Sequence, residues 1–280
     1  MNMNSLLNYH VIYELLNSRS KESNKPFNWN EVAKMYDGMA KLEKEFTLNQ
    51  INQIPLTKED SVVDIGCGPG RLSVPLAKRA KSVTSVDAFD EMLKYCKINA
   101  KIENLNNIKF LKQDWNDKDA TTNIGVHDVV VVSRTVALSD ILRLNKIAKK
   151  YVVILSFAND ISLREIQLDF LKGIIDIPQQ THPNNTRMFG YNIAFNMIYD
   201  MGANPSVVVV DDGFEKIFKS KDEAYEHLRF VGEIPKNKED IYRQNVDRNL
   251  TQLNDGTYHL LRKTKTFVMW WKPEELKVDL

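Results

Sequence analysis

The sequence has little cysteine and no excess of charge of either sign. Two cysteines in 280 residues are too few for a disulfide framework, so we expect Cys67 and Cys96 to be free thiols in a reducing compartment. Lys and Arg number 38 and Asp and Glu 37, which excludes a global field that would attract nucleic acid or an anionic membrane. These absences favour a cytoplasmic protein.

Long apolar runs and metal-binding clusters are also missing. No stretch approaches the ~20 uninterrupted apolar residues of a membrane span, and residues 1–20 have no basic segment before their apolar positions. The histidines form neither an H-x-x-x-H pair nor a cluster with cysteine, and Asp211-Asp212 lacks a third acid at hard-cation spacing. We therefore expect neither a membrane segment nor a metal. The hydrophobic content of 43% is ample for a sizeable core.

What the sequence does contain is a glycine-rich turn. Residues 62–70 read Val-Val-Asp-Ile-Gly-Cys-Gly-Pro-Gly, in which an apolar strand ends at Asp64 and passes through Gly66, Gly68 and Gly70 into a predicted helix. Glycine tolerates backbone conformations that a Cβ would penalise, so a ligand can lie directly against this main chain. Free amides at the start of the helix favour a ligand with a carboxylate or other acceptors.

The glycine spacing narrows the ligand class. Dinucleotide sites use G-x-G-x-x-G and phosphate-cradling P-loops continue into Lys-Ser/Thr, whereas this chain has G-x-G-x-G without that continuation. Asp64 stands where it can accept from an ammonium group or an ordered water. A second strand, 82–86, ends in Asp87, whose carboxylate can bind both hydroxyls of a ribose. Asp87 alone does not separate NAD from other nucleosides.

A third strand, 108–111, runs into Gln113-Asp114-Trp115, which places a carboxylate and an aromatic where an adenine needs an acceptor and a flat surface. With these residues the chain resembles the class I S-adenosylmethionine-dependent methyltransferases. Residues 62–70 match the first motif of that family, Asp87 its ribose-binding acid, and Asp114-Trp115 its adenine-side pair. The match covers roughly residues 60–160, and the core is similar to the ubiquinone/menaquinone-type branch.

The order of elements predicts the fold class. We expect a Rossmann-like α/β fold, with a mostly parallel sheet and helices on both faces, and the family resemblance implies a seven-stranded sheet whose last strand is antiparallel. Three parts are predicted: an N-terminal helical lid over 1–55, the S-adenosylmethionine-binding core over 56–160, and substrate-cap helices with the closing strands over 161–280. The core should alternate through strand 61–66, helix 70–80, strand 82–87, helix 90–104, strand 108–113, strand 128–133, helix 138–149 and strand 151–157.

The flanking parts are predicted less regularly. In the lid, an amphipathic helix with Leu7, Val11 and Leu15 on one face precedes a helical region over 29–54 that is interrupted near Gly38. Beyond residue 157, the patterns predict helices over 163–171 and 191–201 and a strand over 207–210, then about fifty mostly helical residues and a strand over 266–271.

The family resemblance implies a set of cofactor contacts. These are Tyr36, Asp64, Gly66, Cys67, Gly68, Gly70, Asp87, Ala88, Met92, Asp114, Trp115 and Ser133. Several have plainer explanations, because Asp87 could cap a helix, Trp115 could be a core aromatic and Tyr36 could pack between the lid helices. Arg134 could bind a substrate anion or the cofactor carboxylate, or it could form an interdomain salt bridge. No catalytic residue is assigned, and the candidates are Tyr36, Arg134, His182 and Tyr191.

The resulting hypothesis is methyl transfer from S-adenosylmethionine to a small molecule, achieved mainly by positioning the acceptor in line with the methyl group. A first alternative is an RNA or protein methyltransferase, since Arg143, Lys146 and Lys150 have helical spacing and would form a local basic face. A second is a non-catalytic subunit that binds S-adenosylmethionine to regulate or scaffold another protein. An NAD-dependent reductase is disfavoured by the glycine spacing.

Overall fold

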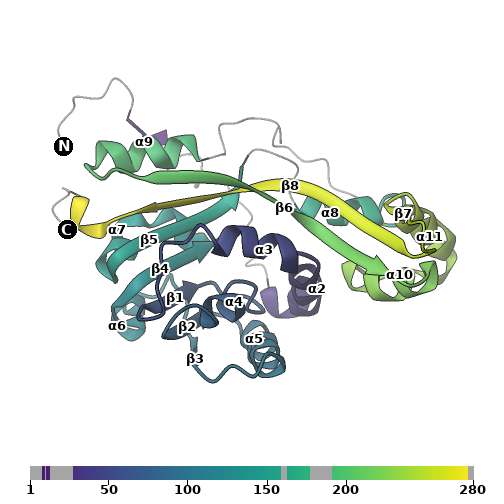
Figure 1. Ribbon diagram of the computed structural model, residues 1–280, viewed down its shortest axis with the longest axis horizontal. Helices are drawn as coiled ribbons and strands as arrows, with labels where there is room; N and C mark the ends of the chain where they lie inside the picture. Colours follow the sequence, from purple (N-terminus) through teal and green to yellow (C-terminus); the bar gives the residue numbers. More distant parts are fainter. Residues whose placement is uncertain (1–7, 10, 13–27, 159–162, 177–190, 277–280) are drawn as a thin grey trace.

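The computed structural model of the chain describes residues 8–9, 11–12, 28–158, 163–176 and 191–276. Its centre is an eight-stranded sheet with the order β3-β2-β1-β4-β5-β8-β6, and β7 pairs with β8 off this path (Figure 1). The strands are β1 Ser61–Ile65, β2 Ser82–Asp87, β3 Ile108–Lys112, β4 His127–Ser133, β5 Ala148–Phe157, β6 Ser206–Phe218, β7 Leu250–Gln252 and β8 Tyr258–Trp271.

The first five strands pair in parallel, and β8 pairs antiparallel with both β5 and β6. This confirms the predicted Rossmann-like class with antiparallel closing strands. Successive residues of β1 and β4 point to opposite faces of the sheet. Val63 and Val130 pack into a cluster with α6, α7 and α9, whereas Val62 and Val129 pack into a second cluster with α3 and α4. The two clusters are the core.

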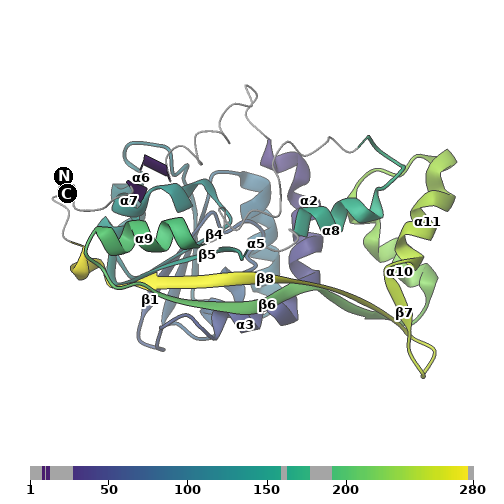
Figure 2. The same cartoon turned by 90° about the horizontal axis from the view of Figure 1, so that it is seen from above.

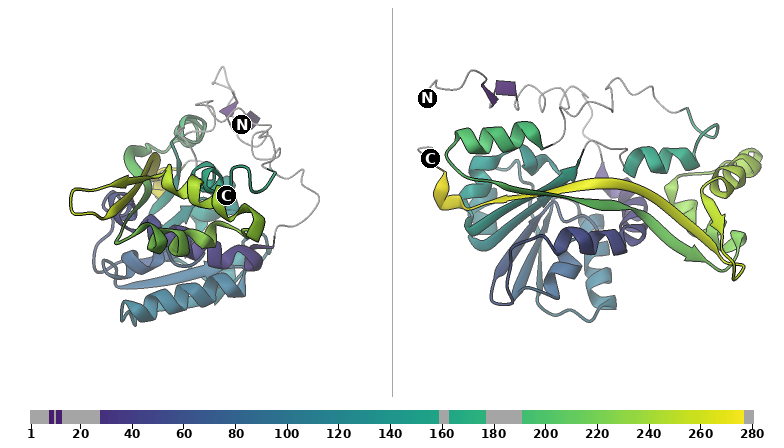
Figure 3. Two further views of the ribbon diagram at one scale, coloured as in Figure 1. Left: turned by 90° about the vertical axis from the view of Figure 1, so that its right-hand side faces the viewer. Right: turned by 45° about the horizontal axis from the view of Figure 1, so that its top comes forward.

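Helices cover both faces (Figure 3). The helices of the described residues are α2 Trp29–Leu42, α3 Lys44–Ile51, α4 Ser73–Ala77, α5 Asp90–Ile102, α6 Ala120–Ile124, α7 Ile141–Lys146, α8 Leu163–Phe170, α9 Asn192–Asp200, α10 Lys221–Leu228 and α11 Glu239–Asp247, with short 3-10 turns at Val136–Ser139, Arg229–Val231, Lys236–Lys238 and Pro273–Glu275. None of these helices is long and apolar enough to cross a membrane.

The closing strands differ from the prediction. In place of a short strand and about fifty mostly helical residues, β6 continues to Phe218 and β8 begins at Tyr258. Figures 1 and 2 show the two strands leaving the sheet as a long ribbon that reaches α10, α11 and β7. The two strands pair without a register shift through Gly213, where a Cβ would lie 2.0 Å from the Arg262 carbonyl oxygen. The extension of β6 was not predicted because charged residues such as Glu215, between the buried Phe214 and Phe218, interrupt the apolar pattern.

The far end of the ribbon has its own apolar core, here called the distal cluster. It is formed by α2, α8, α10, α11 and the ribbon, and its largest fully buried side chains include Phe170, Phe214, Phe218 and Tyr242. Because Met39 and Leu42 of α2 belong to the same cluster, the helix pair α2–α3 packs at once on the ribbon and on the sheet.

Two helix predictions were wrong in detail. The helical region over 29–54 breaks at Glu43 and runs without interruption through Gly38, whose missing Cβ leaves room for the Phe230 ring at 2.4 Å. The helix expected over 138–149 is shorter because β5 already begins at Ala148. Lys150 therefore lies on a strand, so the basic helical face with Arg143 does not form. The predicted helix with Leu7 and Leu15 lies largely outside the described residues.

Candidate functional site

The glycine turn lies at the carboxyl end of β1 and has the backbone that the sequence predicts. Gly66, Gly68 and Gly70 have φ angles of +71°, +53° and +90°, a region that side-chain-bearing residues avoid. A Cβ on Gly66 would lie 2.5 Å from Thr135 Oγ1 and one on Gly70 2.7 Å from Cys96 Sγ. For Gly68 the nearest atom is Met92 Sδ at 4.0 Å. Gly68 is therefore the glycine whose missing side chain leaves room for a ligand.

The turn passes into α4 later than predicted. The helix begins at Ser73, so Gly70 belongs to the loop, and the Gly66 and Cys67 amides donate to the Val86 carbonyl oxygen at 2.8 and 2.9 Å. These two amides hold the loop against β2 and are not directed at a ligand. The loop is thus fixed before any ligand arrives.

Asp87 ends β2 beside Gly68. Its Oδ2 accepts from the Gly68 amide at 2.8 Å and its Oδ1 from the Phe89 amide at 3.0 Å. Burial raises the pKa of the Asp87 carboxyl, although its three backbone hydrogen bonds oppose that shift. A carboxylate has about four lone-pair positions, so these three contacts leave capacity for about one hydroxyl donor. Asp87 and Gly68 form one corner in which a ribose can be bound next to partly exposed main chain.

Asp64 is buried behind the loop. Its carboxylate accepts from Ser73 Oγ at 2.6 Å, and Ser73 Oγ in turn accepts from Ser85 Oγ at 2.8 Å. Desolvation raises the pKa of Asp64 to about 6. In this arrangement Asp64 fixes the start of α4, and its contribution to a ligand would be a negative charge close behind the loop.

The residues after β3 separate into an exposed acid and a buried indole. Asp114 is exposed and accepts from the Asn116 amide at 2.9 Å. Trp115 is only 5% exposed and belongs to the core cluster, with the Arg143 guanidinium 4.5 Å from its ring centre. Its buried Nε1 has no hydrogen-bond partner within the part of the chain that the structure describes. Trp115 therefore packs as the core aromatic that the sequence also allowed.

The end of β4 carries a buried ion-pair network. Arg134 has a left-handed φ of +54° and donates to Glu43 Oε2 at 2.7 Å and to the Asp212 carboxylate, and its guanidinium lies 4.4 Å from the Phe157 ring centre. Burial opposes the charge of Arg134, but Glu43 and Asp212 raise the pKa of its guanidinium. The structure places Arg134 in a salt bridge between the helix pair and β6.

Arg71 is a site residue that the sequence analysis did not single out. Its Nη2 donates to Ser133 Oγ at 2.7 Å and its Nη1 to Gln50 Oε1 at 2.7 Å, with Glu43 Oε2 at 3.7 Å. Its side chain is 11% exposed. The sequence signal that could have identified Arg71 was its position directly after Gly70. A long basic side chain at that position has to lie between the loop, β4 and the helix pair α2–α3.

The other predicted residues lie around these groups. Met92 is 3% exposed and Cys67 5%, and the Cys67 thiol is close enough to Cys96 for burial and that neighbour to raise its pKa. Tyr36 packs edge-on against Trp29 at 5.1 Å and also contributes to the raised pKa of Arg134 after burial, Glu43 and Asp212.

The two remaining catalytic candidates are Tyr191 and His182. Tyr191 precedes α9 and packs edge-on against Phe267 at 5.6 Å. His182 lies outside the described residues. The described residues also contain no group of three or more His, Cys, Asp or Glu side chains that could hold a metal ion.

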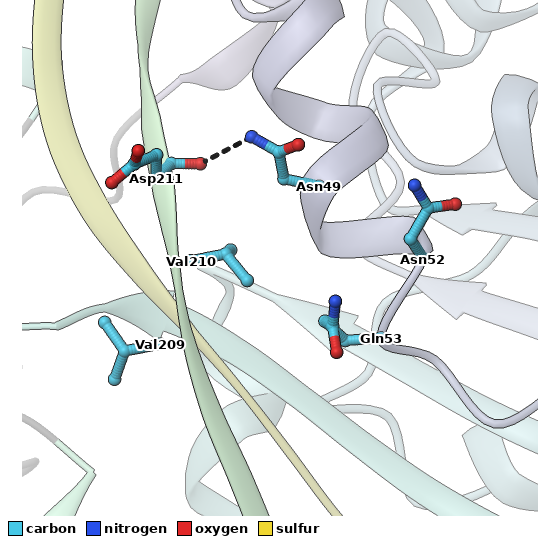
Figure 4. Close-up of a pocket in the computed structure, with 6 residues that line it drawn as sticks. All are labelled: Asn49, Asn52, Gln53, Val209, Val210 and Asp211. Carbon is cyan, nitrogen blue, oxygen red and sulfur yellow. Dashed lines mark hydrogen bonds between the residues drawn. The ribbon is translucent and has the colours of Figure 1, made fainter.

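A pocket of about 380 Å³ lies elsewhere, at the rim between α3 and β6 (Figure 4). Asn49, Asn52 and Gln53 line it on one side and residues 209–211 on the other. Asn49 Nδ2 donates to the Asp211 carbonyl oxygen at 3.2 Å across it. No lining residue belongs to the glycine turn or to the end of β2, so the pocket is separate from the Gly68–Asp87 corner.

Comparisons with known proteins bear on the same region. Residues 56–169 match the model of a family described as a methyltransferase domain. The 23S rRNA (uracil(1939)-C(5))-methyltransferase RlmD of Aliivibrio fischeri is 31% identical over 78 residues, which are 28% of this chain and 18% of that protein. The chain thus spans about a fifth of the length of such curated relatives.

Two further similarities extend beyond the glycine turn. A probable cobalt-precorrin-6B C(15)-methyltransferase (decarboxylating) of Methanocaldococcus jannaschii is 27% identical over 121 residues, 42% of this chain and 66% of that protein. The crystal structure of a precorrin 8W decarboxylase from Methanobacterium thermoautotrophicum aligns with a TM-score of 0.47 and 15% identity, over 81% of this chain and 89% of that one.

Proposed function

We propose that this chain, whose residues 56–169 match the model of a methyltransferase domain, is a class I S-adenosylmethionine-dependent enzyme that transfers a methyl group to a small molecule. The observation that carries the proposal is the corner formed by Gly68 and Asp87. Gly68 has a left-handed φ, no protein atom closer than 4.0 Å to its Cβ position, and an amide bonded to the Asp87 carboxylate. This is the geometry that a nucleoside needs if its ribose is to reach an acid across bare main chain.

The residues around the corner fit the remaining parts of S-adenosylmethionine. Asp87 would bind the ribose hydroxyls, and exposed Asp114 would accept from the adenine amino group. Asp64 supplies negative charge behind the loop for the cofactor's ammonium group, and Ser133 at the end of β4 would contact the amino-acid half. Trp115 would border the adenine site from the core side. Gly66, Cys67, Gly70, Ala88, Met92 and Tyr36 complete the proposed set.

The protein's contribution to the chemistry is positioning. S-adenosylmethionine supplies an already activated methyl group, so the chain has to hold an acceptor in line with it and keep water out. Such positioning is worth roughly 7–11 kcal/mol. A general base would add about 10²- to 10⁴-fold and is needed only for an acceptor that is protonated at the working pH. We assign no catalytic residue. Tyr36, whose helix carries it beside Arg134, is the first to substitute.

A small-molecule acceptor is supported by charge and by the parts outside the core. The net charge is +1, and two of the three basic side chains that suggested an RNA surface pair within the protein. Arg143 donates to the Asp117 carbonyl oxygen at 2.9 Å and to Asp140, and Lys150 pairs with the buried Asp60. The helix pair, α8, α9 and the distal cluster would form the acceptor side. The cobalt-precorrin relative is named as an enzyme of this substrate class.

Methylation of RNA is the second candidate, because the 31% identical relative is named as a 23S rRNA enzyme. The small-molecule and RNA candidates are distinguished by incubating the full chain with methyl-labelled S-adenosylmethionine and either a metabolite pool or total RNA. We expect label in the small-molecule fraction and S-adenosylhomocysteine as product, both lost in Asp87→Ala. Label in RNA, with binding that falls steeply with salt, would support the second candidate. Binding without turnover on any acceptor would support a regulatory subunit. The free thiols fit a cytoplasmic enzyme.

A further inference from the structure

Arg71 lies where three parts of the molecule meet. One end of its guanidinium contacts Ser133 Oγ at the end of β4, and the other contacts Gln50 Oε1 of α3, each at 2.7 Å. The residue itself directly follows the glycine turn. A guanidinium presents its donors in a rigid plane, so the position of α3 is fixed relative to the end of β4 through one side chain.

A second buried contact reaches the same helix pair. Glu43 is the residue between α2 and α3, its side chain is 4% exposed, and its Oε2 lies 2.7 Å from Arg134 and 3.7 Å from Arg71. Asp212 completes the group with a fully buried side chain. Two cations and two anions therefore balance beneath the helix pair. An uncompensated buried charge is strongly unfavourable, so Arg71 and Glu43 depend on each other.

The glycine turn is linked to the helix pair on its other side as well. Asn99 of α5 donates to the Pro69 carbonyl oxygen at 2.9 Å and to Asp37 Oδ1 of α2 at 2.7 Å. Asp37 is 6% exposed. The helix pair is thus bonded to the two residues that flank Gly70, through Asn99 on α5 and through Arg71 itself. Both links join segments that are far apart in the sequence, so they form only when the turn and the helices are folded against each other.

We propose that Arg71 is a positioning residue that couples the cofactor site to the helix pair α2–α3. This rests on the proposed function, in which Ser133 contacts the amino-acid half of S-adenosylmethionine. A ligand that contacts Ser133 would stabilise the Arg71 guanidinium bonded to it, and Arg71 in turn contacts Gln50 and Glu43 of the helix pair. Because coupling between two sites is reciprocal, the helix pair held by Arg71 strengthens cofactor binding.

Arg79 supplies a matched control. It also anchors α3, with Nη1 donating to the Ile51 carbonyl oxygen at 2.8 Å and to Asn52 Oδ1 at 3.0 Å. Its contacts, Ile51 and Asn52, directly follow Gln50 at the carboxyl end of α3, and neither belongs to the glycine turn or to β4. Arg71→Lys and Arg79→Lys each keep the charge and lose the planar fork, so both loosen α3. Only Arg71→Lys removes the link to Ser133.

The experiment is hydrogen exchange of residues 29–51, with and without S-adenosylhomocysteine, in the wild type and both lysine variants, alongside calorimetric binding of the same ligand. In the wild type we expect the ligand to slow exchange at least about tenfold, and Arg79→Lys to keep this effect with affinity within about threefold of wild type. In Arg71→Lys we expect the effect to vanish and the affinity to fall about 10- to 100-fold, which is within the usual range of coupling between two sites. Ser133→Ala, which cuts the link from the other side, should also abolish the ligand-induced protection.

Three outcomes overturn the coupling. Ligand-induced protection that persists in Arg71→Lys, or that persists in Ser133→Ala, contradicts it. Equal effects of Arg71→Lys and Arg79→Lys would show that Arg71 is only a structural anchor. A wild-type chain that does not bind S-adenosylhomocysteine at all would instead refute the proposed function, and the coupling with it.

Discussion

Gly68→Ala tests whether a ligand lies against the glycine turn. A Cβ at Gly68 meets no protein atom closer than 4.0 Å, so the substitution creates no clash within the protein. Its cost to folding is the left-handed backbone at φ +53°, about 1–2 kcal/mol for alanine. At this chain length each kcal/mol lowers the melting temperature by about 2–4 °C. The variant should therefore fold, with a modestly reduced melting temperature.

The effect on binding should be much larger than the effect on folding. The new methyl group occupies the space beside Asp87 into which the ribose is proposed to reach, and a ligand displaced there loses its hydrogen bonds to the carboxylate. We expect the affinity for S-adenosylhomocysteine to fall at least about 100-fold, or about 2.8 kcal/mol at about 1.4 kcal/mol per tenfold. Isothermal titration calorimetry measures this directly.

Gly125→Ala is the control for backbone strain. Gly125 has a φ of +77° and a ψ of −177°, a region that is essentially reserved for glycine, and no atom lies within 4 Å of its Cβ position. It follows α6 and is not part of the glycine turn. We expect an equal or larger fall in melting temperature than for Gly68→Ala, and unchanged affinity. If Gly68→Ala bound the ligand as tightly as Gly125→Ala, the reasoning that places the ligand at Gly68 would be refuted.

Three further predictions concern buried groups. Burial raises the pKa of Asp64 from 3.8 to about 6, so folding favours its protonated form and the wild type loses stability as the pH rises through that value. In urea unfolding, the stability of Asp64→Asn relative to wild type should therefore increase by up to about 3 kcal/mol between about pH 4 and pH 7. A difference in stability that stays constant with pH would contradict this prediction. Because burial and the adjacent Cys96 thiol raise the pKa of Cys67, neither thiol should react quickly with an aromatic disulfide reagent until the chain is unfolded, and rapid reaction of the native protein would be inconsistent with the packing. Gly213→Ala would place a methyl group 2.0 Å from a backbone oxygen and should lose more than about 3 kcal/mol of stability. Gly256→Ala, whose Cβ position is open, should lose about 1–2 kcal/mol. Equal losses would show that the ribbon tolerates a side chain at Gly213.

The parts of the fold that were predictable are those encoded locally. The valine-rich strands β1 and β4, the positive-φ glycines and the acid at the end of β2 follow from a few adjacent residues, since each requirement is met within one strand or turn. The corner between Gly68 and Asp87 also follows, because parallel neighbouring strands end at the same edge of a sheet.

The parts that were missed depend on contacts between distant segments. The extended ribbon of β6 and β8 is stabilised by cross-strand pairs, such as Phe218 with Tyr258, and by packing in the distal cluster. A local sequence pattern reveals neither of these. The break at Glu43 makes sense only beside Arg71 and Arg134, which come from other elements. The burial of Trp115 likewise depends on α6 and α7 packing over it. In each case tertiary packing decides between two locally reasonable readings.

The central claim is that the Gly68–Asp87 corner binds the nucleoside of S-adenosylmethionine. Equilibrium binding of S-adenosylhomocysteine to the full chain, to Asp87→Asn and to Asp90→Asn tests it most directly. Asp90 is the neighbouring exposed acid, which pairs with Lys112 at the surface. We predict one ligand per chain, affinity lowered about 10- to 100-fold in Asp87→Asn through loss of a charged acceptor, and no change in Asp90→Asn. No binding to the wild type, or equal binding by all three proteins, would contradict the account.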